Sequence, residues 1–135
     1  MAFNSLTIRL TAECLHHLPD SPSIVELGNQ TFKPSSGTLD EIHAFMKRSS
    51  LNWNENEFIE VKKTSQSSKS EFSPENYLMS IGYKDYTCID INKRYNALLM
   101  DLNQNLNSHY NFKQKFDLTT NRGTGEHVLD RKSVV

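Results

Sequence analysis

An acidic residue and a glycine stand at the end of a short apolar run near the start of the sequence. Ile24, Val25 and Leu27 surround Glu26, and Gly28 ends the run. Such a run is typical of a buried strand of a parallel sheet that turns into a ligand-facing loop. Gly28 can adopt a positive φ and lets the backbone approach a ligand closely. Because open α/β sheets bind ligands at the carboxyl ends of their strands, Glu26 is a candidate binding residue. The alternative is a core strand followed by an ordinary turn.

Two further carboxylates stand near the ends of later candidate strands. Residues 86–91 form a β-branched run that predicts a buried strand with Asp90 near its end, and residues 97–102 contain Asp101. The second run also keeps helical spacing, but the asparagines after it are poor helix formers and favour the strand. Only residues 92–96 separate the two runs, too few for a usual parallel crossover. Either the connection is irregular or one strand is very short.

A third acidic position follows a predicted strand at residues 116–121. Residues 122–127 form a glycine-bearing turn that ends in Glu126 and His127. Glu126 suits a helix N-terminus, because a carboxylate there interacts favourably with the helix dipole. The pair is therefore either a helix cap beside a packed or exposed histidine, or part of an active site.

Composition narrows the class of protein. The 135 residues suffice for one domain with a single core. A net charge of −1 gives no electrostatic case for nucleic acid or for an anionic membrane. Cys14 and Cys88 are far apart and lack zinc-site spacing, and two lone thiols fit a reducing compartment. Arg9 interrupts the N-terminal apolar stretch, and no run has the length of a transmembrane helix. We therefore expect a soluble, cytoplasmic protein without a metal site.

An amphipathic helix is predicted within residues 1–20, which we expect to form an N-terminal element of their own. Asn4 or Ser5 can cap its start, and Pro19 ends it. Its expected apolar stripe consists of Leu6, Ile8, Leu10, Cys14, Leu15 and Leu18.

The middle of the chain predicts one helix and a long polar excursion. The sequence from Thr38 to Glu41 matches a capping box that starts a helix. Residues 49–71 are polar and rich in serine, and we expect a mobile excursion there, broken by a short strand at residues 58–61. Trp53 in this excursion either lines a ligand pocket or anchors the loop on the core.

A further helix is predicted between the excursion and the Asp90 strand. Ser73 and Pro74 suit its cap and its first position, and Gly82 suits its end. A strand at residues 24–27, this helix and the strand at 86–91 would form a right-handed βαβ crossover. The expected fold class is therefore α/β with a parallel sheet.

Taken together, these stretches resemble the class I S-adenosylmethionine-dependent methyltransferases. In that family a strand of the form apolar-apolar-acid-apolar-glycine leads into a loop around the methionine part of the cofactor, and residues 24–28 match it. A second strand ends in an acid that binds the ribose hydroxyls, which Asp90 matches. A third often ends in an acid near the adenine, which Asp101 matches. In the fourth, an apolar-Asp-Leu motif precedes a Glu-His pair, as at residues 116–118 here.

The resemblance covers about residues 24–127 and implies a partial Rossmann-like three-layer fold in residues 21–135, the N-terminal half of the family's sheet. It implies S-adenosylmethionine as the cofactor, with Glu126 and His127 in the active site, and no motif identifies a methyl acceptor. The cofactor-binding residues that it implies are Glu26, Gly28, Asn29, Asp90, Ile91, Asp101, Leu102 and Asn121.

The chemistry of this assignment is simple. A carboxylate at a strand end can accept hydrogen bonds from both ribose hydroxyls, and an acidic pocket around Glu26 suits the positive sulfonium and ammonium groups. Two departures from the family pattern stand out. Gln30 and Phe32 occupy positions where the family usually has glycine. The family sheet has seven strands, and we expect this chain to be truncated after the fourth and inactive alone.

Two other functions compete with this one. A non-catalytic interaction module would pair through the open edge of the fourth strand, with itself or with a partner, and we expect a homodimer on that ground. A nicotinamide-binding domain would also use Asp90, but no G-x-G-x-x-G follows Leu27.

Overall fold

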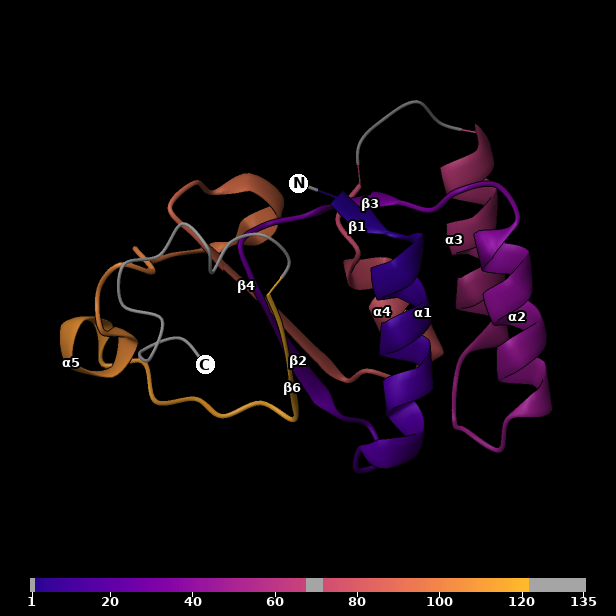
Figure 1. Ribbon diagram of the computed structural model, residues 1–135, viewed down its shortest axis with the longest axis horizontal. Coiled ribbons are helices and arrows are strands. Elements are labelled where there is room, and N and C mark those ends of the chain that lie inside the picture. The colour runs from indigo at the N-terminus through magenta and orange to yellow at the C-terminus, as the bar shows by residue number, and fades with distance from the viewer. Residues whose placement is uncertain (1, 68–71, 122–135) are drawn as a thin grey trace.

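A four-stranded parallel sheet lies at the centre of the molecule (Figure 1). The computed structural model describes residues 2–67 and 72–121. The sheet has the order β5-β4-β2-β6, which is the third, second, first and fourth of its strands along the chain. The first four strands of a doubly wound Rossmann-like sheet have this order. The strands are β2 (Ser23–Leu27), β4 (Asp85–Asp90), β5 (Leu98–Leu99) and β6 (Leu118–Thr120). The expected α/β class with a parallel sheet is confirmed, and its order is compatible with a partial Rossmann-like fold.

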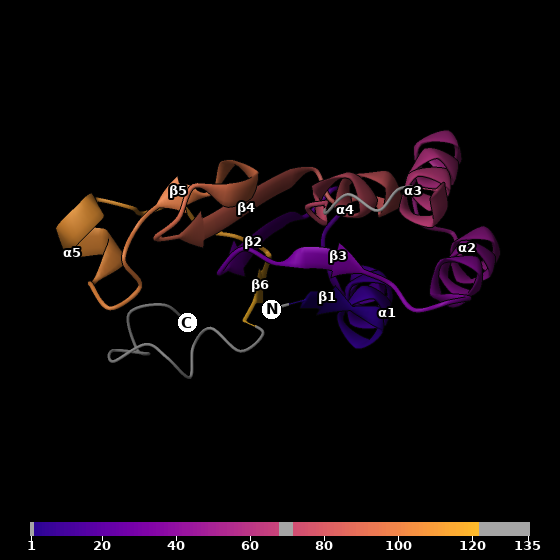
Figure 2. The ribbon, with the colours of Figure 1, turned by 90° about the horizontal axis from the view of Figure 1, so that it is seen from above.

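Helices cover this sheet unequally. Viewed from above, α1 to α4 lie at one end of the molecule and α5 at the other, with the sheet between them (Figure 2). A second, two-stranded parallel sheet joins β1 (Ala2–Asn4) to β3 (Thr31–Lys33) beside α1. The helices are α1 (Ser5–Cys14), α2 (Thr38–Arg48), α3 (Glu55–Ser67), α4 (Glu75–Ile81) and α5 (Leu106–Tyr110), with the 3₁₀ turns η1 (Leu15–His17) and η2 (Arg94–Asn96).

The central strand β2 is buried on both faces, because alternate side chains enter two separate cores. Ile24 belongs to the larger core, which α1 to α4 and β1–β3 complete. Val25 and Leu27 belong to a smaller core that includes Ile89 of β4 and Leu106 of α5. The near-continuous apolar run in the sequence reflects this two-sided burial.

The helix α1 begins where the sequence predicts but buries a different face. The Asn4 side chain caps it by accepting from the backbone N–H of Thr7 at 3.3 Å. Ile8 is fully buried, whereas Leu6 and Leu10 are 50% and 46% exposed. The predicted stripe is therefore wrong at these two leucines.

Hydrogen bonds explain which face of α1 turns inward. The hydroxyl groups of Tyr77 and Tyr83 donate to the carbonyl oxygens of Ile8 and Thr11, at 2.8 and 2.7 Å. Thr11 is buried too, because its hydroxyl group donates to the carbonyl of Thr7 in its own helix. Counting apolar residues alone misplaced the stripe, because two threonines contribute to the buried face.

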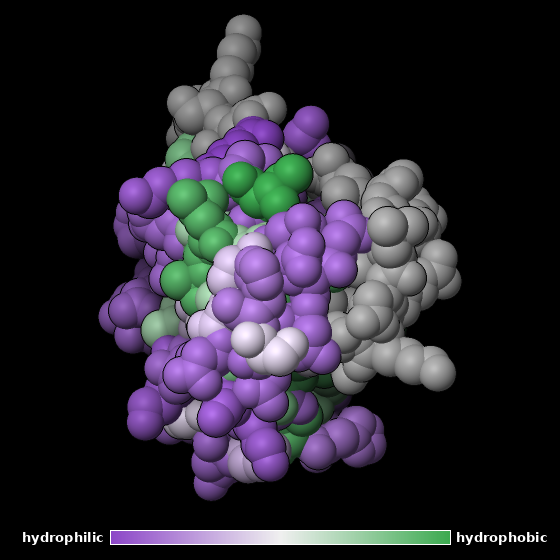
Figure 3. Space-filling view, turned by 90° about the vertical axis from the view of Figure 1, so that its left-hand side faces the viewer, coloured by the Kyte–Doolittle hydropathy of each residue, from purple (hydrophilic) through white to green (hydrophobic). Residues whose placement is uncertain are grey.

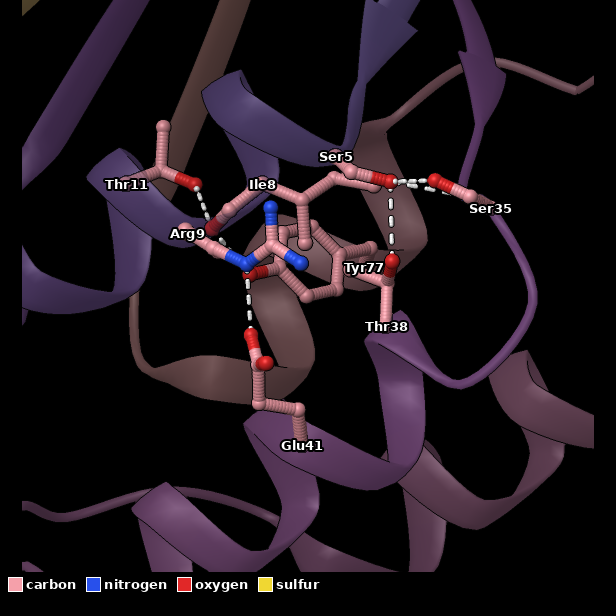
Figure 4. Close-up of polar contacts among 8 residues, drawn as sticks. All are labelled: Ser5, Ile8, Arg9, Thr11, Ser35, Thr38, Glu41 and Tyr77. Carbon is pink, nitrogen blue, oxygen red and sulfur yellow. Dashed lines mark hydrogen bonds and ion pairs between the residues drawn. The ribbon is translucent and has the colours of Figure 1, made fainter.

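The helices α1 and α2 are joined by polar side chains at their N-terminal ends (Figure 4). Ser5 Oγ lies 2.8 Å from Thr38 Oγ1, and Arg9 Nε lies 2.5 Å from Glu41 Oε2. The expected capping box at residues 38–41 is wrong, since Gly37 is the N-cap, with φ +82°. Thr38 and Glu41 instead bind α1, so these side chains serve a tertiary contact.

The polar excursion at residues 49–71 contains a helix, and the expected strand at residues 58–61 is wrong. Asn54 accepts from the backbone N–H of Glu57 at 3.0 Å at the start of α3. Phe58 is fully buried, and Trp53 packs edge-on against it at 5.8 Å between ring centroids. Trp53 anchors this segment on the core, and it also lines a surface cleft. The mobility of the segment stays a prediction.

A strand is confirmed within the predicted residues 97–102, but it is shorter than predicted: β5 covers only Leu98–Leu99, which pair with Ile89 and Asp90 of β4. It lies at an edge of the sheet and exposes Leu98 and Leu99 by 40% and 54%. The face of the molecule at this end shows apolar surface among polar side chains (Figure 3).

The helix α4 ends at Gly82, as predicted, with φ +128°. Within the described residues, no helix combines the length and apolar character needed to cross a membrane.

Candidate functional site

The turn after β2 and the end of β4 lie against each other at the carboxyl edge of the sheet. Gly28 has φ +86°, and its N–H donates to the carbonyl oxygen of Ile89 at 2.7 Å. The next N–H, of Asn29, donates to Asp90 Oδ2 at 2.8 Å. The structure thus brings together three of the predicted binding residues, Gly28, Asn29 and Asp90, from segments about sixty residues apart.

The carboxylate of Asp90 is held in place by backbone groups. Its Oδ1 accepts from the N–H of Ile91 at 2.6 Å, and its Oδ2 accepts from Asn29. A carboxylate oxygen can accept two hydrogen bonds, so each oxygen keeps one lone pair beyond these contacts. Asp90 is half-buried, and the adjoining Ile91 is 73% exposed. Asp90 can therefore accept two further hydrogen bonds from a ligand with adjacent hydroxyl groups.

The side chain of Asn29 fixes the turn on its outer side. Its Nδ2 donates to Asn92 Oδ1 at 2.5 Å and to the carbonyl oxygen of Arg94 at 3.2 Å. These bonds link the turn after β2 to the segment that follows β4. The two loops therefore form one surface at the strand ends.

A cationic group also belongs to this surface, and sequence reasoning missed it. Arg94 Nη2 donates to Thr31 Oγ1 at 3.2 Å and to the Tyr95 hydroxyl oxygen at 3.0 Å. The guanidinium carbon lies 4.8 Å from the centre of the Tyr95 ring. Tyr95 has φ +57°, an uncommon conformation for a residue other than glycine. No periodicity or motif in the sequence predicts that Arg94, Tyr95 and Thr31 lie together.

Glu26 lies in a drier environment than Asp90. It is 1% exposed, and its Oε1 accepts from the N–H of Gln30 at 3.2 Å and from the Tyr86 hydroxyl group at 2.8 Å. Its Oε2 has no hydrogen-bond partner in the part of the chain that the structure describes. Burial raises the pKa of Glu26 to about 8, although the bonds from Tyr86 and Gln30 act in the opposite direction. At neutral pH most molecules therefore carry a neutral Glu26.

The neighbours of Glu26 across the sheet are Cys88 on β4 and Thr120 on β6. Register partners in parallel strands present their side chains on the same face. Thr120 Oγ1 is also buried without a hydrogen-bond partner among the described residues. Burial, followed by the nearby Glu26, raises the pKa of the Cys88 thiol to about 12, so this cysteine stays a thiol. Two buried polar atoms thus lie on the neighbouring strands β2 and β6, where the strand order reverses.

The remaining predicted residues are more scattered. Asp101 lies two residues beyond β5, where its backbone N–H donates to the Tyr110 hydroxyl at 2.7 Å. Leu102 is buried in the smaller core, which gives it a packing role. Asn121 is exposed directly after β6. Glu126 and His127 lie outside the described residues.

The described part of the chain holds no group of three or more His, Cys, Asp or Glu side chains that could bind a metal ion. Comparison with protein-family models, with curated proteins and with solved structures found no match. Three features of the structure therefore indicate its function: the strand order, the Gly28 turn and the Asp90 carboxylate.

Proposed function

We propose that the carboxyl edge of the sheet binds S-adenosylmethionine and that the chain is a methyltransferase-like protein. The observation that carries this proposal is the 2.8 Å hydrogen bond from the Asn29 N–H to Asp90 Oδ2, which joins the glycine turn after β2 to the acid at the end of β4. Both segments lie next to the place where the strand order reverses, the usual ligand site of an open α/β sheet.

The residues present fit the nucleoside part of this cofactor. Asp90 has two free lone pairs for the adjacent ribose hydroxyls, and such charge-assisted bonds are among the stronger ones in proteins. Gln30 and Phe32, which stand where the family has glycine, are 1% and 7% exposed. Because these side chains are buried, they do not themselves cover the Gly28 turn.

The methionine part would lie toward Glu26 and Thr120. Their two buried oxygen atoms have no hydrogen-bond partner among the described residues, so a bridging water could bind them, and an ammonium group would bind there with Glu26 ionised. When bound, the cofactor supplies an activated methyl group, and the protein contributes mainly by positioning the two reactants. Arg94 is the cation near the turn that could bind a carboxylate, because guanidinium groups match its geometry.

Calorimetric titration with S-adenosylmethionine, S-adenosylhomocysteine and NAD tests this proposal. We expect the first two to bind and NAD to fail. Asp90→Ala should weaken binding by roughly 1.5–3 kcal/mol, about 10- to 150-fold, the usual worth of a hydrogen bond to a charged group. Asp85→Ala is the matched control, since Asp85 is exposed at the opposite end of the same strand. Equal affinity of Asp90→Ala and the parent protein contradicts the proposed placement.

A second candidate function is an interaction module that pairs through β6. Among the described residues, β6 has a strand partner on one side only, the central strand β2. Its partly buried Leu118 makes an apolar edge without a proline, and such edges favour strand pairing. This candidate predicts a homodimer that binds no cofactor, and light scattering at micromolar concentration checks it. A monomer in solution would count against it.

A further inference from the structure

A groove between α3 and α4 lies apart from the strand ends. Its volume is about 520 Å³, within the range of small-molecule sites. Phe32 of β3 and Tyr77 of α4 are stacked at its base, with ring centroids 5.3 Å apart and an interplanar angle of 25°. Val61, Phe72 and Met79 add apolar walls. Phe32 and Tyr77 are buried, so the apolar surface that the groove offers to a small molecule comes mainly from these walls.

The charged groups that line the groove in the described part of the chain all have one sign. Glu57 and Glu60 of α3 and Glu75 of α4 belong to its lining, and no described lining residue is a lysine or an arginine. Glu60 has a surface contact of 3.6 Å with Lys63. Glu57 and Glu75 form no ion pair within the described part of the chain. Three carboxylates around one groove repel each other, and a bound cation would relieve that repulsion.

We propose that this groove binds a small organic cation, an amine or quaternary ammonium group carried on an apolar body. Carboxylates at the rim give a cation a charge-assisted contact, and the partly exposed ring of Phe72 in the wall can add a cation–π contact. The apolar walls bind the rest of the ligand. Neither Asp90 nor the Gly28 turn belongs to the lining, so this site is independent of the proposed cofactor site.

Three probes of similar size and different charge test the proposal. These are 2-phenylethylamine, 2-phenylethanol and phenylacetate, each titrated at low salt while the Met79 methyl resonance is followed. We expect the amine to bind roughly 5- to 10-fold more tightly than the alcohol, and phenylacetate to bind weakest, since a rim carboxylate discriminates by charge. Added salt should reduce the preference for the amine.

Variants show whether the rim carboxylates are responsible. Replacing all three, in Glu57→Gln with Glu60→Gln and Glu75→Gln, should remove the preference for the amine and leave alcohol binding unchanged. Glu13→Gln, at an exposed position of α1 outside the groove, is the control and should keep the preference. Asp90→Ala should also keep it, which separates this site from the cofactor site. The inference is overturned if amine and alcohol bind equally, if no probe shifts the Met79 resonance, or if the triple variant still prefers the amine.

Discussion

Two carboxyl groups lie on neighbouring strands near the same edge of the sheet, and their surroundings differ. Asp90 is the last residue of β4 and accepts hydrogen bonds from two backbone N–H groups. Glu26 is one residue inside the end of β2, where it is 1% exposed and has one oxygen without a hydrogen-bond partner among the described residues. In the register of these strands Glu26 pairs with Cys88, so Asp90 lies two positions further along the sheet, where it meets the turn after β2 rather than the core.

The difference has a chemical consequence. Backbone donors favour a charged carboxylate, whereas burial without a cation favours the neutral acid. Burial accordingly raises the pKa of Glu26 to about 8, although the hydrogen bonds from Tyr86 and Gln30 act in the opposite direction. An acid that looks like a charged ligand-binding group in the sequence can be neutral in the folded protein.

The largest expected effect concerns the pH dependence of stability. The pKa of Glu26 is raised on folding, so its favourable contribution is complete below its unfolded value near 4.5 and is lost as the pH rises through about 8. At about 1.4 kcal/mol per pH unit, the free energy of unfolding should fall by roughly 2–4 kcal/mol between about pH 5.5 and pH 8.5. Urea unfolding across this range measures the fall.

Glu26→Gln provides the comparison for that prediction. The amide is neutral at every pH, so its unfolding free energy should change far less across this range. Hydrogen bonds with Lys62 and His43 lower the pKa values of Asp40 and Glu55. These two groups therefore make the free energy of unfolding rise with pH, and they do so at a lower pH than the range tested here. An identical pH dependence in parent and variant would mean that Glu26 is charged in the folded protein.

A smaller effect is expected from Tyr86→Phe. The Tyr86 hydroxyl group donates to Glu26 Oε1, and its removal should cost about 0.5–1.5 kcal/mol of stability. The variant should also raise the pKa of Glu26 further, because that bond favours the carboxylate. Nuclear magnetic resonance titration of the Glu26 carboxyl carbon measures this pKa. A pKa that falls in Tyr86→Phe would contradict the proposed role of the bond.

The smallest effect should come from Thr120→Val. Valine has the shape of threonine without the hydroxyl group, which has no hydrogen-bond partner among the described residues. The free energy of unfolding of the unligated protein should therefore rise by less than about 1 kcal/mol. Thermal unfolding measures this change. A clear destabilisation would show that Thr120 Oγ1 has a partner, such as a buried water shared with Glu26.

The sequence predicts the sheet well because burial on both faces leaves a strong pattern. The runs around Val25 and Ile89 are almost continuously apolar, and both strands are confirmed. A strand within the predicted residues 97–102 is confirmed as well, although it is shorter than predicted. The helix faces are harder, because the burial of Thr11 in α1 depends on hydroxyl bonds that no hydropathy pattern encodes. The sequence of residues 49–71 predicts a loop because the buried Phe58 stands in a mostly polar stretch, which hides the helix α3.

For the candidate site, the sequence identifies acids at strand ends but not their surroundings. The turn that joins Asn29 to Asp90 depends on adjacent strands, which the predicted crossover correctly implies. The exposure of Glu26 depends on what α4 and β3 bring over that face of the sheet, and residue spacing contains no such information. Arg94 and Tyr95 meet through an uncommon backbone conformation that composition does not predict.

Mapping of S-adenosylhomocysteine on isotopically labelled protein tests the central claim most directly. If the cofactor binds at the carboxyl edge of the sheet, the backbone amide resonances of Gly28, Asn29 and Ile91 should shift on titration, and those of α3 should not. The same titration of Asp90→Ala should require about 10- to 150-fold more ligand. The account is contradicted if these amides do not respond at millimolar ligand, or if the shifts are confined to the α3–α4 groove.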